Sequence, residues 1–366
     1  MKKVLALIIM LAMVLSLAAC GGSKTQQTPE PAPAEEPMVL KIGVLTMLGT
    51  TEEELVSYFD TVGLATQALT QAGKASGVMA EKNGQEMPEN IPTEVIFYDS
   101  LDAMLMALNA GDINTMSIYN ATADYLVANN DKLVKGLTYD YDPNGNDFST
   151  TMLRGLLSNS FSFMMMEGRE DLRDAFSEAI TAMQDDGTLD RFIKEQMRAV
   201  VDGKQIEAIE MPVIEGAETI KVAITGSLPP MDYVAADGTA AGYNTAVLAE
   251  ISRRIGKNIE LVVVDSVGRA AALASGTVDA VFWTRTSDSG SKVVARSEED
   301  NKKFIEEKNT HLTPEEQELF AQIRENFDIR DHGTKDMPEG TIVTISYFRD
   351  AIVPVMTKDF LEAMPK

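Results

Sequence analysis

The sequence predicts an α/β fold made of two lobes, each containing half of an open sheet. The first reason is the region 220–286, which alternates strand and helix patterns in the order β-α-β-α-β. The second is an internal echo, because 106–114 and 271–279 match position by position in residue type, as two lobes built on one plan would. The third is length, since over 300 residues follow the N-terminal region, enough for two separate cores.

The region 220–286 gives the clearest elements. It begins with a strand pattern at 220–224 and continues, over 242–256, with apolar residues at helical spacing before a glycine suited to a helix C-cap. The unbroken β-branched run 259–264 is typical of a parallel strand that is buried on both faces. A short helix at 270–275 and a strand at 278–283 complete the unit. In such sheets ligands bind outside the carboxyl ends of the strands.

The first half of the chain shows the same alternation. Strand patterns cover 39–46, 93–98, 112–119 and 161–166, and helix patterns cover 101–110, 120–130 and 169–192. Another helix is expected to begin near Thr50 or Thr51, either of which can be its N-cap. The backbone N–H groups of the same turn are alternatively a site for the carboxylate or other polar group of a ligand.

The N-terminus has the parts of a secretory signal. Met1-Lys-Lys precedes an apolar run that is too short for a comfortable membrane span, and small residues precede Cys20. Leu17-Ala-Ala-Cys20 resembles the lipobox of bacterial lipoproteins, which implies acylation of Cys20, for example with palmitate, and a lipid anchor in the membrane. An ordinary signal peptide with a chance cysteine is the alternative. The Pro- and Glu-containing stretch that follows is expected to be a disordered spacer.

Composition argues against several function classes. The formal charge is −24, with 56 acidic against 32 basic residues, which disfavours nucleic acid as a partner. His311 and His332 are the two histidines, and Cys20 is the single cysteine, so a zinc site or a His-based triad is not expected. The sequence has no phosphate loop and no dinucleotide fingerprint. We therefore expect no enzyme activity, no cofactor and no metal.

Four motifs in the region 220–286 carry a family resemblance. They are Ile220-Lys-Val-Ala-Ile, Pro229-Pro-Met-Asp-Tyr, Gly242-Tyr-Asn and Ala272-Leu-Ala-Ser-Gly-Thr-Val-Asp279. In this order they resemble the first lobe of extracellular solute-binding proteins of family 3. The resemblance implies a two-lobed, type II periplasmic-binding fold, which closes by hinge bending on a small polar ligand, amino-acid-like or related, and delivers it to an ABC permease. It also implies an extracytoplasmic, monomeric receptor, as in amino acid transport.

The order of the lobes departs from the family. Residues 39–200 resemble the second lobe plus the closing helices, whereas 219–286 resemble the first lobe and 340–356 the strand that leaves it. One interpretation is a circular permutant, in which the usual termini are joined through about 198–219 and the new ends lie at the hinge; the other is a fusion of two incomplete receptors. The hinge strands are expected near 347–355 and 161–166.

The expected domains follow from this order. They are a signal peptide (1–19), a linker (20–38), the second, small lobe (39–160), a hinge strand with the closing helices of the large lobe (161–200), a linker (201–218), the first, large lobe (219–296), a helical insertion (297–338), and a hinge strand with the C-terminus (339–366). The insertion is either a solvated helical hairpin or a docking surface for a permease or another partner.

The candidate ligand-binding residues lie at the ends of the predicted strands. From the large lobe we expect an apolar and aromatic wall with hydroxyls and a guanidinium for an anionic group: Met231, Tyr233, Ser266, Trp283, Thr284, Arg285 and Thr286. From the small lobe we expect Thr50, Thr51, Tyr119 and Asn120. Trp283 is alternatively a core residue, and Arg285 a surface residue.

Three positions depart from what the resemblance implies. Ser291 stands where the family has its carboxylate-binding arginine, Tyr119 where it has the acid for an α-amino group, and Ser266 where it has an aromatic residue. These changes disfavour an ordinary α-amino acid as the ligand. The alternatives are a degenerate receptor that acts as a sensor or scaffold, and a hydro-lyase on the same fold.

Overall fold

The computed structural model describes most of the two expected lobes. Its continuous stretches are 39–46, 92–139, 158–204, 208–235, 238–265, 268–286 and 338–363, with shorter pieces within 51–76 and 313–321. At positions 200 and 283–286 the backbone alone is described. Several parts of the chain to which the sequence analysis assigns a role lie outside the described residues: the signal peptide, the linker 20–38 with Cys20, Thr50, Ser266, Ser291 and most of the insertion.

One half of the sheet, which we call the large half-sheet, has the strand order β12-β8-β13-β7-β14. Its strands are β12 (Asn258–Val263), β8 (Thr219–Ile224), β13 (Ala280–Thr286), β7 (Ser158–Met166) and β14 (Thr341–Val343). The first three are parallel to one another, and β7 is antiparallel to both β13 and β14. The parallel pairing predicted for the run 259–264 is confirmed. Its expected burial on both faces is wrong, because β12 is the edge strand of this half and Val263 is exposed.

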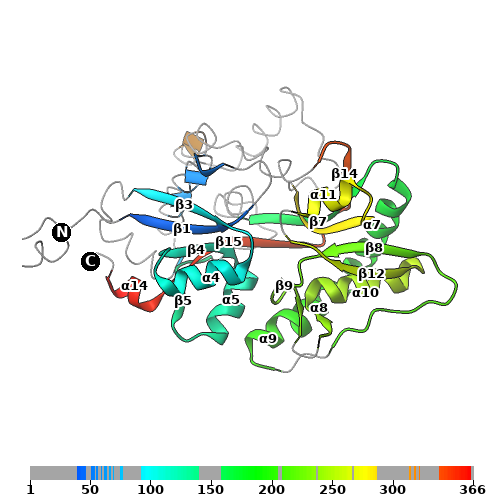
Figure 1. Ribbon diagram of the computed structural model, residues 1–366, viewed down its shortest axis with the longest axis horizontal. Helices are drawn as coiled ribbons and strands as arrows, with labels where there is room; N and C mark the ends of the chain where they lie inside the picture. Colours follow the sequence, from blue (N-terminus) through cyan, green and yellow to red (C-terminus); the bar gives the residue numbers. More distant parts are fainter. Residues whose placement is uncertain are drawn as a thin grey trace, which may run out of the picture. The chain divides into compact units, whose positions relative to one another are not determined.

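The other half, the small half-sheet, repeats this arrangement. Its order is β3-β1-β4-β15-β5, built from β3 (Thr93–Tyr98), β1 (Leu40–Leu45), β4 (Thr115–Tyr119), β15 (Phe348–Thr357) and β5 (Leu133–Lys135). Strands β1, β3 and β4 are parallel, and β15 is antiparallel to β4 and β5. In Figure 1 the red strand β15 is found with the blue and cyan strands of this half.

Two long strands join the halves. β7 and β15 pair antiparallel from Phe161 with Phe348 to Ser158 with Ala351 (Figure 1). β7 lies next to the three parallel strands of the large half-sheet, and β15 lies next to the three parallel strands of the small half-sheet. The predicted hinge strands thus correspond to these two elements, and the predicted α/β class with its two-part sheet is confirmed.

The bounds of the described helices are as follows: α4 (Leu101–Ala110), α5 (Asn120–Asn129), α7 (Glu170–Asp185), α8 (Thr188–Phe192), the π-helix η2 (Ile193–Arg198), α9 (Ala199–Val201), α10 (Tyr243–Ile255), α11 (Gly268–Ala274) and α14 (Lys358–Ala363). In the large half-sheet, α7 and α10 pack on one face and α11 on the other. The Ser100 Oγ accepts from the backbone N–H of Ala103 and so caps α4, and the predicted glycine C-cap of α10 is Gly256. Within the described residues, no helix is both long and apolar enough to cross a bilayer.

Short strands complete the structure. β9 (Ser227–Leu228), β10 (Asp232–Val234) and β11 (Ala240–Ala241) form a small antiparallel sheet between β8 and α10. β2 (Ala75–Ser76) pairs with β6 (Thr138–Tyr139).

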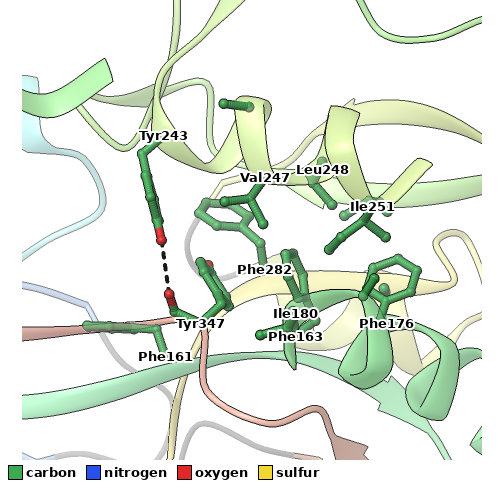
Figure 2. Close-up of a cluster of buried hydrophobic side chains, with 14 of the residues drawn as sticks. Phe161, Phe163, Phe176, Ile180, Tyr243, Val247, Leu248, Ile251, Phe282 and Tyr347 are labelled. Carbon is green, nitrogen blue, oxygen red and sulfur yellow. Dashed lines mark hydrogen bonds between the residues drawn. The ribbon is translucent and has the colours of Figure 1, made fainter. Parts of the chain in front are cut away.

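Each half-sheet has its own core. The core of the large half-sheet contains the predicted apolar stripe of α7, and Figure 2 shows Phe176 and Ile180 of that stripe facing Val247, Leu248 and Ile251 of α10. The core of the small half-sheet is formed by α4, α5 and the strands that they cover. A third cluster, which includes Met164 and Val281, lies on the opposite face of the large half-sheet, under α11. Two separate cores allow the two halves to keep their internal packing when they move relative to each other.

The structure corrects three expectations about elements. The strand expected at 278–283 continues to Thr286, because residues 284–286 pair with Ser160–Ser162 of β7. The single strand expected at 340–356 is two strands, β14 and β15, since residues 344–347 lie between them. Residues 193–198 are π-helical rather than a plain end of the closing helices.

Candidate ligand-binding site

The end of β13 and the end of β4 meet at the same residue of β7. Arg285 is the register partner of Phe161, and the ring of Tyr119 meets the ring of Phe161 edge to face, at 4.8 Å between centroids. The Nδ2 of Asn159 donates to the Tyr119 hydroxyl at 3.1 Å. The structure therefore brings Tyr119 and the backbone of 284–286 together at the junction between the half-sheets.

A β-bulge lies in β13 just before this junction. The register with β7 shifts between Val281, opposite Met164, and Thr284, opposite Ser162. The extra residue falls at Phe282 or Trp283, at the carboxyl end where ligands bind in such sheets. Phe282 is fully buried in the core of the large half-sheet.

Arg349 of β15 is a polar residue of the junction that the sequence did not single out. Its Nη2 donates to the Ser160 Oγ at 2.8 Å, and its Nη1 donates to the Ser158 Oγ at 3.4 Å. Arg349 and Thr286 are both register partners of Ser160, one from each side. The three residues therefore form one row across β13, β7 and β15.

The next residue, Asp350, has a buried carboxyl group at the start of α5. Its Oδ2 accepts from the backbone N–H of Ala121 and its Oδ1 from that of Ala351, each at 2.8 Å. Burial raises the pKa of Asp350 to about 7, and the nearby Asp124 adds to this, while the two amides and Lys135 act in the opposite direction. This carboxyl group ties the crossing strand to the first turn of a helix in the small half.

Asn120, a predicted ligand-binding residue, is held by its own neighbours. Its Oδ1 accepts from the Lys135 Nζ at 2.7 Å, and its Nδ2 donates to the Asp124 Oδ2 at 3.1 Å. The Lys135 Nζ also pairs with the Asp124 Oδ1 at 2.5 Å. The amide of Asn120 is therefore part of a local polar network that fixes the start of α5.

The turn after β8 is organised by Asp232. Its carboxylate oxygens accept from the backbone N–H groups of Thr225 and Gly226, at 2.8 and 2.9 Å, and from the Thr225 hydroxyl at 2.8 Å. Burial raises the pKa of Asp232 to about 6 although these hydrogen bonds oppose the rise. The carboxyl group therefore stabilises the turn that precedes Tyr233.

Tyr233 lies where the large half approaches the small half. It is partly buried, and its pKa is raised by that burial and by Tyr125 of α5, which is therefore nearby. In the same small sheet, Leu228 packs against the cores of both half-sheets. This hairpin thus bridges the two halves on the side of α4 and α5.

The structure places two other predicted ligand-binding residues, Met231 and Thr51, away from the junction between the half-sheets. Met231, expected on the wall of the cleft, is fully buried in the core of the large half-sheet, because the start of α10 closes over its backbone: the N–H of Asn244 donates to the Met231 carbonyl at 2.8 Å. Thr51 is exposed, and its carbonyl accepts from the N–H of Leu55 at 3.2 Å, as expected at the beginning of a helix. For Trp283, Thr284, Arg285 and Thr286 the structure describes the backbone, and residues 284–286 pair with Ser160–Ser162 of β7.

The sequence missed Asn159, Ser160, Arg349, Asp350 and Asp232. A signal was available for the first three, since Arg349 falls within the hinge strand expected near 347–355, and Asn159 and Ser160 directly precede the other, expected near 161–166. In the part of the chain that the structure describes, no three His, Cys, Asp or Glu side chains are grouped so that they could hold a metal ion.

Comparisons with solved structures find solute-binding proteins at low similarity. A ligand-binding component of an ABC-type import system from Staphylococcus aureus, with zinc bound, has 9% identity and a TM-score of 0.37, with 89% of this chain and 68% of that chain covered. The aliphatic sulphonate binding protein SsuA from Escherichia coli has 11% identity and a TM-score of 0.32, with 90% and 68% covered. A phosphate-binding protein from Streptococcus pneumoniae has 12% identity and a TM-score of 0.31, with 88% and 89% covered.

Comparison with protein families is more specific. No curated protein matches this chain. Residues 220–330, however, match the model of bacterial extracellular solute-binding proteins, family 3. The chain therefore carries the sequence pattern of family 3 of the bacterial extracellular solute-binding proteins in residues 220–330, and the resemblance predicted from its motifs is confirmed.

Proposed function

We propose that this protein is the solute-binding receptor of an ABC-type importer and that it holds a small polar molecule between its two half-sheets. The observation that carries the proposal is the pairing of β7 with β15, which connects two half-sheets of the same strand arrangement, each with a core of its own. The family match over residues 220–330 supports the same function.

The geometry suits closure by bending. Four residue pairs, from Phe161–Phe348 to Ser158–Ala351, join the two crossing strands between the half-sheets. A small change of backbone angles there turns one half relative to the other without breaking either core. A ligand that contacts both halves binds the closed form better and so shifts the population towards it.

The proposed ligand is amino-acid-like or a related polar solute, but not an ordinary α-amino acid. Tyr119, at the position of the family's acid, accepts from Asn159 and packs on Phe161. Because a phenol carries no charge at neutral pH, it does not pair with an ammonium group as a carboxylate does.

We propose further that the chain is a circular permutant. In support, the connection between α9 and β8 packs on the large half, where Ile209 and Met211 contact its core. The Asn258 side chain accepts from the N–H of Ile214 at 2.7 Å and donates to its carbonyl at 3.0 Å. This connection runs from the closing helices to the first strand of the same half-sheet, where a permutant needs a link between the usual termini.

The proposed receptor is extracytoplasmic and held to the membrane by lipid on Cys20. The lipobox-like Leu17-Ala-Ala-Cys20 supports this placement. One acyl chain gives marginal binding to a bilayer and two give stable anchoring, so the number of chains attached decides how firmly the receptor is held.

A ligand screen tests the proposal. The chain from residue 20 onward, with Cys20→Ser, would be heated in the presence of amino acids, polyamines, organic acids and peptides. A ligand at about 100 times its Kd stabilises the folded state by about 2.7 kcal/mol, which raises the Tm by several degrees. Turnover of the ligand would favour an enzyme instead, and no shift with any compound would favour a scaffold.

A further inference from the structure

We propose that Tyr243 and Asn244 of α10 are positioning residues for closure, which hold the entrance of the crossing strand β15 to the large half through Tyr347. This inference rests on the proposed receptor function and adds to it the residues that control how the two halves move. Both positioning residues are fully buried, so their role does not require contact with a ligand.

Tyr347 is bound to the large half through its backbone and its side chain. Its N–H donates to the Phe161 carbonyl at 2.9 Å, and its carbonyl accepts from the Tyr243 hydroxyl at 2.9 Å (Figure 2). Its own hydroxyl donates to the Asn244 Oδ1 at 2.9 Å, and its ring stacks on that of Phe163, with 4.6 Å between centroids. Two consecutive residues at the start of α10 therefore fix both the backbone and the side chain of Tyr347.

The residues just before Tyr347 are held to the same half by α7. The N–H of Ile345 donates to the Ser177 Oγ at 3.3 Å. The carbonyl of Ser346 accepts from the Gln184 Nε2 at 3.1 Å. Side chains from two helices of the large half thus determine the path along which the chain enters β15.

The small half binds the same strand from Asp350 onward. The Asp350 Oδ2 accepts from the N–H of Ala121 in α5 at 2.8 Å, and Ile352 pairs with Tyr119 of β4. In this strand the chain therefore passes from one half to the other within the residues between Tyr347 and Asp350. Because a bend between the halves is taken up over so short a stretch, the direction in which the strand leaves Tyr347 affects the orientation of the small half.

The side chain of Asn244 is costly at a core position. The residue is fully buried, and in the part of the chain that the structure describes its Nδ2 has no hydrogen-bond partner. A buried donor without a partner is rare and destabilising, and an apolar side chain of similar size would avoid it. What asparagine offers in return is the acceptor for the Tyr347 hydroxyl. Positioning of Tyr347 thus explains this residue better than core stability does.

Spin labels on the two halves test this role. The chain from residue 20 onward carries Cys20→Ser, which removes its single cysteine, and is labelled at two exposed helix positions through Asn109→Cys in α4 and Asp171→Cys in α7. Pulsed electron double resonance then gives the distribution of distances between the labels in the absence of any ligand. Tyr347→Phe keeps the ring but loses the bond to Asn244. The ratio of distances outside the wild-type peak to those within it should rise by about fivefold, the change in an equilibrium constant expected for one hydrogen bond.

Four further variants sharpen the comparison. Asn244→Ala should give the same result as Tyr347→Phe, and Asn244→Asp should restore the wild-type distribution because a carboxyl oxygen also accepts from the hydroxyl. Tyr243→Phe loses the bond to the Tyr347 carbonyl and should broaden the distribution as well. Thr245→Val is the matched control, since it removes another buried hydrogen bond of α10, to the Ala241 carbonyl at 3.0 Å, that does not involve the crossing strand. It should lower the unfolding free energy without changing the distances.

Urea unfolding of every variant separates a loss of stability from a change of distance. If Tyr347→Phe does not fold, Tyr243→Phe takes its place. Wild-type distances in the Tyr347, Asn244 and Tyr243 variants would show that their bonds serve the core alone and would overturn the inference, as would equal broadening in Thr245→Val. Because no ligand is used, these outcomes leave the receptor function to the ligand screen. A silent screen together with broadened distances would count against the receptor function and in favour of the positioning role.

Discussion

The carboxyl group of Asp350, in the crossing strand β15, accepts the backbone N–H of Ala121, the second residue of α5, at 2.8 Å. It therefore satisfies one of the free donors at the start of that helix from a different element of the fold. Because the group is buried, its proton is bound more tightly in the folded chain than in the unfolded chain.

Stability should therefore fall as the pH rises from about 4 to about 7. The pKa of Asp350 is raised from 3.8 to about 7, and that of Asp232 from 3.8 to about 6, so the folded state holds more protons in this window. The contribution is fully present below about pH 4 and is lost as the pH passes the folded pKa. Urea unfolding at about pH 4.5, 6 and 8 measures it, with an expected change on the order of a few kcal/mol. Asp350→Asn should flatten the slope, whereas Asp102→Asn, on the exposed side of α4, should keep it; an unchanged slope in Asp350→Asn would contradict the assignment.

Gly242 should not tolerate a side chain. Its φ is +106°, and a Cβ there would lie 2.5 Å from the Met231 carbonyl oxygen, which accepts the N–H of Asn244. Gly242→Ala should cost about 2–4 kcal/mol of unfolding free energy, from strain and displaced backbone. Gly238→Ala is the matched control, since its φ is +86° and no atom lies within 4 Å of the added Cβ. It should cost about 1 kcal/mol. Equal losses in urea unfolding would show that the close approach to Met231 does not matter.

Local pattern was sufficient for the elements whose residues signal their own environment. The apolar stripe of α7 predicted a buried helix, because burial of one stripe leaves a direct mark on composition. The β-branched run at 259–264 predicted the strand β12, but not its burial, because a position at the edge of the sheet depends on strands elsewhere in the chain. The extension of β13 to Thr286 left no such mark. Thr284-Arg-Thr286 is polar, and its strand conformation depends on pairing with β7, more than 100 residues earlier.

The candidate site could likewise be predicted from the sequence only in part. Strand ends can be located from sequence, and the backbone of 284–286 and Tyr119 do meet at Phe161. The register between two crossing strands cannot be read from local pattern, so the row that joins Ser160 to Arg349 was missed. Met231 was expected on the apolar wall of the cleft, but whether its side chain faces the cleft or the core depends on how α10 packs over the turn.

Acylation of Cys20 should determine whether the protein is in the membrane fraction or in the soluble extracytoplasmic fraction. The mature chain is expected in the membrane fraction of a bacterial host and to be labelled by a palmitate analogue, because the acyl chains attached through Cys20 bury their methylenes in the bilayer. Cys20→Ser should remove the label and move the protein to the soluble extracytoplasmic fraction. Ser23→Ala, three residues later, serves as the matched control and should change neither result. A wild-type protein that is soluble and unlabelled would leave the ordinary signal peptide as the explanation.

Reconnecting the chain should restore the usual lobe order without loss of structure. Lys366 would be joined to Val39 by about 15 Gly and Ser residues, which span about 20 Å on average, and the chain would be opened between Lys204 and Ala208. β15 and β1 belong to the same half-sheet, and the opened connection lies outside the strands, so each half-sheet keeps its pairing. The Tm should stay within a few degrees of the wild-type value, and ligand affinity within about twofold. As a control, the same chain opened between Ala249 and Glu250, inside α10, should fail to fold because that helix is part of the core. Two independent unfolding transitions in the reconnected chain would instead favour the fusion of two incomplete receptors.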